Sequence, residues 1–135
     1  MSIEAAIYSI LAGDTAVGAI AGDRISPHQR LQGTALPAVT YLIDDFEPFR
    51  GISGTAGLTA ATLTVTAIAN TYSDAKGLSA AVIAALNGAD GTYGTTVVKS
   101  LDYERSTPTD TGIGEGDEDL PYEIESQYRI HYAGL

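Results

Sequence analysis

Two pairs of neighbouring carboxylates are the side chains in this sequence that come closest to a catalytic pattern. Asp44 precedes Asp45, and Glu123 lies two residues before Glu125. Two carboxylates on either side of a glycosidic bond can hydrolyse it. However, consecutive strand residues point to opposite faces, and acids two residues apart on an exposed strand usually form its solvated side. The chain also has no Trp to stack on a sugar, so we expect no catalytic residues and keep a carboxylate hydrolase only as an alternative.

Metal and phosphate sites have less support still. The two histidines, His28 and His131, have no Ser, Asp or second His at a motif spacing, and the chain has no Cys to supply a thiolate. The glycine-rich stretch 112–116 lacks the Lys and the following helix of a phosphate-binding loop. The acids of 110–119 lack the ligand spacing of a calcium-binding loop, which leaves at most opportunistic Ca²⁺ binding. We therefore expect no enzyme activity, no cofactor and no metal site.

The composition is that of one folded, acidic domain. A length of 135 residues is typical of a domain with a single hydrophobic core. The composition, with 44% hydrophobic and 18% charged residues, is typical of globular proteins. Acidic residues outnumber basic ones by 17 to 7, and the resulting net charge of −10 argues against a broad surface that grips DNA. An acidic channel through which DNA passes is compatible with it. The first basic residue is Arg24, and no apolar run reaches the ~18 residues of a membrane span, so we expect no secretory signal, no membrane segment and folding in the cytoplasm.

The N-terminal half predicts helices followed by one strand. Ile3, Ile7, Ile10 and Leu11 recur at helical spacing up to Gly13. A short helical turn follows over 15–20, capped by Asp14, and 24–35 has no sustained period and is expected to be an extended connection. A strand is predicted over 37–43, and the Gly-, Pro- and Asp-rich stretch 44–57 is predicted to be a long turn.

The C-terminal half predicts one strand, one helix and two further strands. Residues 58–69 alternate Thr with apolar side chains, as in a half-buried strand, and the stripe from Ala75 to Leu86 predicts a helix capped by Ser73 or Asp74. A strand is expected over 95–104 and a mobile loop over 105–121. The last strand, 122–132, has the sharpest alternation, which predicts one apolar face and one face that is wet or an interface.

Together these elements predict an α+β fold: one mainly antiparallel four-stranded sheet packed against two main helices, in the order helix-strand-strand-helix-strand-strand. The paired strands favour hairpins, and most strands have a single apolar face, so we expect both helices on one side of the sheet. We expect one domain over 1–135, with long loops at 44–57 and 105–121.

The chain resembles the tail terminator, or tail completion, proteins of long-tailed bacteriophages and gene transfer agents over nearly its whole length. The resemblance rests on degenerate patterns of small and apolar residues at the end of the first helix, before and within the first predicted strand, and in the second strand and helix. Those patterns are LAGDTAV at 11–17, GDRI at 22–25, LPAVTY at 36–41, LTVTA at 63–67 and YSDAKGL at 72–78. The resemblance implies a structural virion protein that forms a homohexameric ring, closes the completed tail tube and offers its other face to the head connector or stopper.

It also implies a position at the head-proximal end of the tail, after assembly in the bacterial host cytoplasm, and no chemical reaction. Other readings stay open: another neck component, such as a head-completion or connector protein, or a soluble ligand-binding module.

Two hypotheses about surfaces come from the residues themselves. Phe46, Phe49 and Arg50 stand in a polar stretch and are of the types enriched at interface anchors, so we expect them to contact a neighbouring subunit or the tail tube, unless the two Phe pack back on their own sheet. The second hypothesis follows from the net charge, because acids around a bore would repel DNA phosphates and let DNA pass without tight binding. It assigns to the bore or its rim some of Asp110, Glu115, Asp117, Glu118 and Asp119.

Overall fold

The computed structural model describes residues 3–22, 24–27, 37–51, 54–93, 96–109 and 122–133. In this part of the chain the helices are α1 (Ile3–Gly13), α2 (Thr15–Ala21) and α3 (Tyr72–Leu86). The strands are β1 (Ile25–Pro27), β2 (Ala38–Gly51), β3 (Gly54–Ala69), β4 (Gly91–Tyr93), β5 (Thr96–Thr109) and β6 (Tyr122–Ala133).

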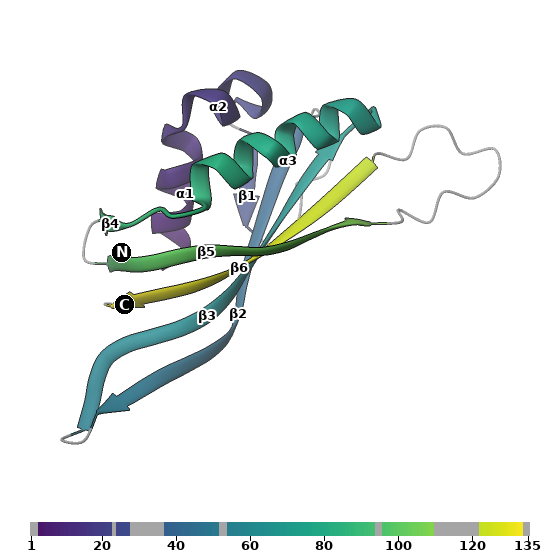
Figure 1. Ribbon diagram of the computed structural model, residues 1–135. Helices are drawn as coiled ribbons and strands as arrows, with labels where there is room; N and C mark the ends of the chain where they lie inside the picture. Colours follow the sequence, from purple (N-terminus) through teal and green to yellow (C-terminus); the bar gives the residue numbers. More distant parts are fainter. Residues whose placement is uncertain are drawn as a thin grey trace.

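The strands form one mixed, curled sheet in the order β1-β2-β3-β6-β5-β4 (Figure 1). Strand β1 is parallel to β2, and the other neighbours are antiparallel. Strands β3 and β6 pair over their whole shared length, from Leu58 opposite Ala133 to Ala69 opposite Tyr122. The last strand of the chain therefore lies inside the sheet, between β3 and β5.

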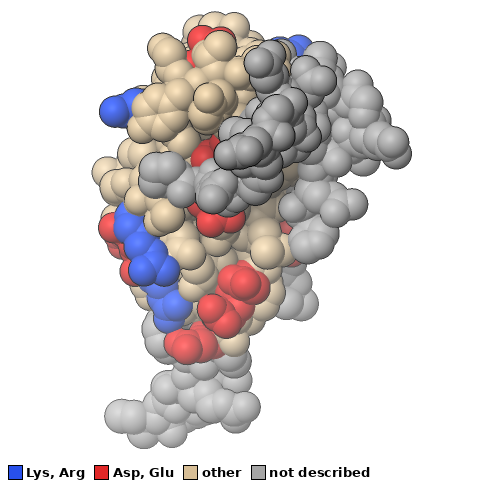
Figure 2. All heavy atoms as spheres, turned by 90° about the vertical axis from the view of Figure 1, so that its right-hand side faces the viewer, with Lys and Arg blue, Asp and Glu red and all other residues tan. Residues whose placement is uncertain are grey.

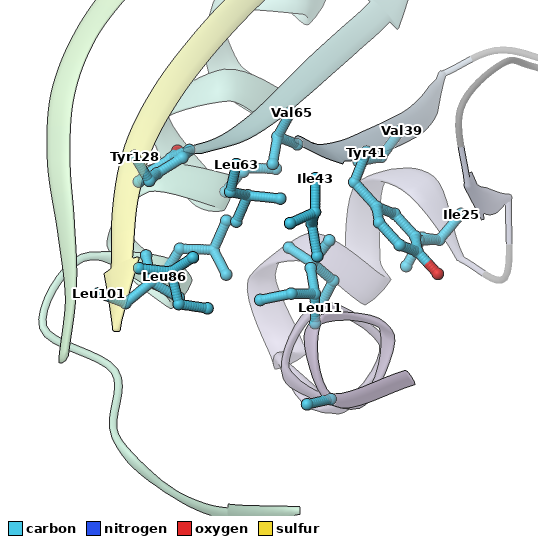
Figure 3. Packing of buried hydrophobic residues seen from close by; sticks show 14 of the residues in the cluster. Leu11, Ile25, Val39, Tyr41, Ile43, Leu63, Val65, Leu86, Leu101 and Tyr128 are labelled. Carbon is cyan, nitrogen blue, oxygen red and sulfur yellow. The ribbon is translucent and has the colours of Figure 1, made fainter. Parts of the chain in front are cut away.

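All three helices lie on the same face of the sheet (Figure 1). Residues of α1 and α3 at helical spacing are buried there, among them Ile7, Leu11, Leu78 and Leu86. They meet alternate residues of the central strands, so that Leu11, Leu63 and Tyr128 belong to one core (Figure 3). No helix covers the opposite face in the described part of the chain.

Side-chain caps fix where the helices begin. The Asp14 carboxylate accepts a hydrogen bond from the backbone N–H of Val17 at 3.0 Å, as predicted for α2. At α3 the cap is Thr71, whose Oγ1 accepts from the N–H of Asp74 at 3.1 Å. The prediction of Ser73 or Asp74 as the cap was wrong, because the helix begins two or three residues closer to the end of β3.

The predicted fold was wrong in the number and order of its elements and in the type of sheet, although the two predicted strand pairs, β2 with β3 and β5 with β6, are antiparallel. In the described chain six strands, not four, form a mixed sheet, and three helices, not two, pack on it. The order is helix-helix-strand-strand-strand-helix-strand-strand-strand. The two missed strands, β1 and β4, have three residues each, which is too short for a period of two to be recognised. They exist because they pair with longer strands: Ile25 stands opposite Val39, and Thr92 opposite Val97.

The predicted long turn at 44–57 was also wrong. Strand β2 continues to Gly51 and β3 begins at Gly54. The turn-forming residues are taken up by shifts of register between Asp44 and Glu47 and between Phe49 and Arg50. Likewise β5 extends to Thr109, beyond the predicted end at 104. The rest of the predicted 105–121 loop, 110–121, lies outside the described residues.

Membrane-spanning helices were also sought in the described chain. No single helix there is long and apolar enough to cross a membrane, and α1 and α2 reach that length only together, across an 84° bend.

Candidate assembly surfaces

The residues considered for catalysis or metal binding do not converge in the described chain. Glu123 and Glu125 both lie on the helix-free face of β6, because they alternate with buried Ile124 and Ser126. His131, on the same face, hydrogen-bonds through Nδ1 with the Ser100 hydroxyl at 3.0 Å. Among the residues that the structure describes, no three His, Cys, Asp or Glu side chains are grouped so that they could hold a metal ion. His28 lies outside the described residues.

The helix-free face carries rows of mostly polar side chains that run across four strands. One row joins Asp44, Thr62, Arg129 and Asp102, and the next joins Leu42, Thr64, Gln127 and Arg105. Arg129 forms an ion pair with Glu47 at 2.9 Å, and Arg105 donates to the Gln127 side chain, also at 2.9 Å. In Figure 2, acidic side chains are scattered over the visible face, and basic side chains form a strip at its left border with further ones near the top. The wet face predicted for the last strand is therefore a broad, mixed-charge sheet surface.

A bulge in β2 presents the first residue of the predicted interface. Asp44 pairs with Thr62 and Glu47 with Ala60, so Asp45 and Phe46 together stand opposite the single residue Ala61. Asp45 adopts a φ of 53°, which Asp tolerates better than most residues. Phe46 is left 48% exposed, so about half of its surface is available for a contact with another chain. The side chains of Phe49 and Arg50 lie outside the described part of the structure, although their backbone belongs to β2.

The edges of the sheet form a second candidate surface. Strand β1 covers β2 only at Val39–Tyr41 by register, and beyond that point β2 has β3 as its sole strand partner in the described chain. On the other side, β4 covers β5 at 96–98. Further along β5, the Leu101 carbonyl accepts a hydrogen bond from the Gly88 N–H, and the Tyr103 N–H donates to the Asn87 side-chain oxygen. From Arg105 to Thr109 no described strand lies beyond β5. Uncovered edges are templates for pairing with another chain.

The acidic residues predicted to line a bore, from Asp110 to Asp119, lie outside the described residues. The strands that flank them are described. Thr109 at the end of β5 pairs with Glu123 near the start of β6. The described strand ends on either side of 110–121 therefore lie next to each other.

Sequence reasoning missed an apolar groove between α3 and the ends of β5 and β6. Its volume is about 220 Å³, and it is lined by Tyr72, Lys76, Ser79, Ala80, Ile83, Ser106 and Ile124. Tyr72 is 47% exposed and packs edge-to-face on Tyr122, with ring centroids 6.3 Å apart. The Lys76 ammonium lies over the Tyr72 ring, 5.9 Å from its centroid. The spacing of Tyr72, Lys76 and Ile83 along α3 was the only signal of this groove in the sequence.

The described structure thus has an α+β fold whose candidate sites are surfaces for assembly: an open sheet face, two open edges, a bulged strand and a groove. A comparison with family profiles identifies the class of protein. The profile of the tail completion protein gp17 family matches residues 5–132, and the chain belongs to that family. The resemblance found in the sequence is thereby confirmed, and the chain is a structural protein of a phage-type tail.

A solved structure has the same fold. A chain from the structure described as the virion of a native gene transfer agent (GTA) particle superposes with a TM-score of 0.76, at 20% sequence identity, covering 95% of this chain and 92% of that one. No curated protein matches.

Proposed function

We propose that this protein forms a ring that closes the completed tail tube and provides the surface to which the head joins. The observation that carries the proposal is the match of a tail completion family over residues 5–132, nearly the whole chain. The partners are then further copies of the chain, the tail tube protein on one side and a head connector or stopper on the other. The position is the head-proximal end of the tail.

The open edges support assembly into a ring. The edge of β2 beyond Tyr41 and the edge of β5 beyond Glu104 lie on opposite sides of the sheet, because β2 and β5 are separated by β3 and β6. Two different patches that meet head to tail give a closed ring when the rotation between subunits closes. Six subunits is the number that the family resemblance implies.

The experiment is the native mass of the purified protein over a wide concentration range, alone and with tail tubes. We expect a hexamer, or a monomer that becomes a ring on tube ends.

Replacing Phe49 and Arg50 together with Ala should leave the melting temperature of the monomer within about 2 °C of the original. The replacement should abolish assembly, because the β2 edge loses its interface anchors.

Three outcomes would contradict these expectations. A strict monomer that ignores tube ends would favour a ligand-binding module. A ring that attaches to tail-less heads first would favour another neck component. A double variant that melts earlier yet assembles normally would mean that these side chains pack within their own subunit.

The acidic segment is proposed to repel DNA inside the ring. Changing Asp117, Glu118 and Asp119 to Lys should make the assembled ring bind duplex DNA, with an affinity that falls steeply as salt rises, because Lys–phosphate contacts release counterions. The unaltered ring should show no binding at physiological salt. Filter binding across a salt series measures both.

A matched control has the same change in net charge. Glu4, Asp74 and Asp90 lie on or beside the helices, and their change to Lys should leave DNA binding weaker than in the first variant. Equal binding by the two variants, or tight binding by the unaltered ring, would remove the segment from the bore.

A further inference from the structure

The groove beside α3 is shaped for one side chain. Its volume of about 220 Å³ is below the roughly 300–1,000 Å³ of small-molecule sites. Ile83 and Ile124 give it apolar walls, and beneath it Ile124 packs with Ala69 and Ala75 in a small buried cluster. Lys76 lines it as well and, among the described residues, is the single charged side chain that does so. Such a site favours an apolar group that carries negative charge beside it.

The β2 bulge presents a group of this kind. Phe46 has the largest exposed fraction among the big hydrophobic side chains of the described residues, at 48%. Asp44 and Asp45 directly precede it, and all three are exposed. The acids complement the charge of Lys76, and the ring complements the apolar walls.

A single copy does not bring these two features together. The N-terminal end of α3 lies at the side of the molecule where β6 begins, while β2 runs past its bulge towards the opposite, lower end (Figure 1). A contact between them therefore joins two copies head to tail. This is the type of contact that builds a closed ring.

We propose that Phe46 of one copy occupies the α3 groove of the next, with Asp44 and Asp45 facing Lys76. The inference rests on the proposed ring and names the contact that builds it. Ser106 of β5 also lines the groove, so the contact lies beside the open β5 edge. Phe46 would then enter the groove at the place where the β2 edge of its own copy lies beside the β5 edge of the neighbour.

Cross-linking tests the contact, because the chain has no cysteine of its own. The double variant Asp44→Cys/Lys76→Cys removes one charge from each side of the contact but keeps Phe46 and the apolar walls Ile83 and Ile124. Treatment with a short bis-maleimide should give a ladder of covalent multimers. Either single variant should stay essentially free of that ladder. The pair Asp44→Cys/Asp90→Cys is the matched control, since Asp90 is exposed beyond the other end of α3, and it should not cross-link.

Two further substitutions in the double-cysteine background test the ring and the groove. Phe46→Ala should weaken association by roughly ten- to a hundredfold, because the apolar area of a Phe is no longer buried. Ala80→Trp should have a similar effect by filling the groove, and Ala80 is exposed enough to accept it. In both variants the ladder should fade while circular dichroism stays unchanged.

The outcomes separate this contact from the ring itself. A multimer by native mass that gives no ladder, or a ladder that persists with Phe46→Ala, overturns the contact and leaves the proposed ring standing. Loss of tube binding by Ala80→Trp with normal self-assembly also overturns it, because the occupant of the groove is then the tube protein. A strict monomer, with or without tubes, overturns both.

Discussion

Replacing Leu63 with Ala will lower the free energy of unfolding by about 3 kcal/mol. Leu63 is fully buried in the middle of β3, and Ile43 and Tyr128 stand beside it on the neighbouring strands. Figure 3 places it where the sheet meets the helices, in the same core as Leu11 and Leu86. The sheet holds this position on both sides, so the structure cannot close over the lost atoms, and a cavity adds to the lost burial.

Chemical denaturation of the full chain measures this effect, and for a chain of this size the melting temperature should fall by about 10 °C. Thr64→Ala is the matched control. Thr64 is the next residue of the same strand, pairs with Leu42 and Gln127, and faces the helix-free side. Its replacement should change stability by less than about 0.5 kcal/mol. Equal losses at the two positions would mean that the helix-free face is also packed.

The parts of the fold that the sequence predicted well are those with a long, regular period. Strand β6 is buried at alternate positions from Ile124 to Tyr132, as its sequence alternation predicted. The stripe of Ala75, Leu78, Val82 and Leu86 is the buried face of α3. In both cases the pattern repeats at least four times, so local sequence and burial agree.

The parts that the sequence predicted wrongly depend on partners far along the chain. Residues 44–51 have turn chemistry, yet hydrogen bonding to β3 holds them in a strand, and a bulge at Asp45 absorbs the mismatch. The α3 groove could not be predicted because Ser106 and Ile124 reach it only through the pairing of β5 with β6. The polar neighbours of Phe46 made an interface role worth predicting, but the bulge that leaves Phe46 48% exposed depends on the register between β2 and β3 and could not be predicted.

Alkaline pH will destabilise this protein through Tyr128. The side chain is fully buried, and its hydroxyl lies 2.8 Å from Ser126 Oγ, which donates to the Val65 carbonyl. Burial raises the pKa of Tyr128 from 10.0 to about 12, Tyr103 acts in the same direction, and the Ser126 hydrogen bond opposes both. The folded protein therefore keeps the proton after the unfolded chain has begun to lose it.

The sign of the effect follows from that order of proton loss. Below pH 10 both states are protonated and the stabilisation is fully present. Between pH 10 and 12 the unfolded chain releases the proton first, so stability falls by about 1.4 kcal/mol per pH unit, or about 2.7 kcal/mol in total. Burial also raises the pKa values of Tyr41 and Tyr132, so the unaltered protein will lose more than Tyr128 alone accounts for.

Urea denaturation at pH 9, 10, 11 and 12 isolates the contribution of Tyr128 by comparison with Tyr128→Phe. The variant should cost about 1 kcal/mol at pH 9, because one buried hydrogen bond is lost. It should then lose stability less steeply, so that the two curves cross between pH 10 and 12. Tyr122→Phe, at a 41% exposed position, should follow the unaltered protein throughout. Parallel curves for Tyr128→Phe and the unaltered protein would mean that Tyr128 ionises in the folded state, and hence that the layer between α3 and β6 admits water.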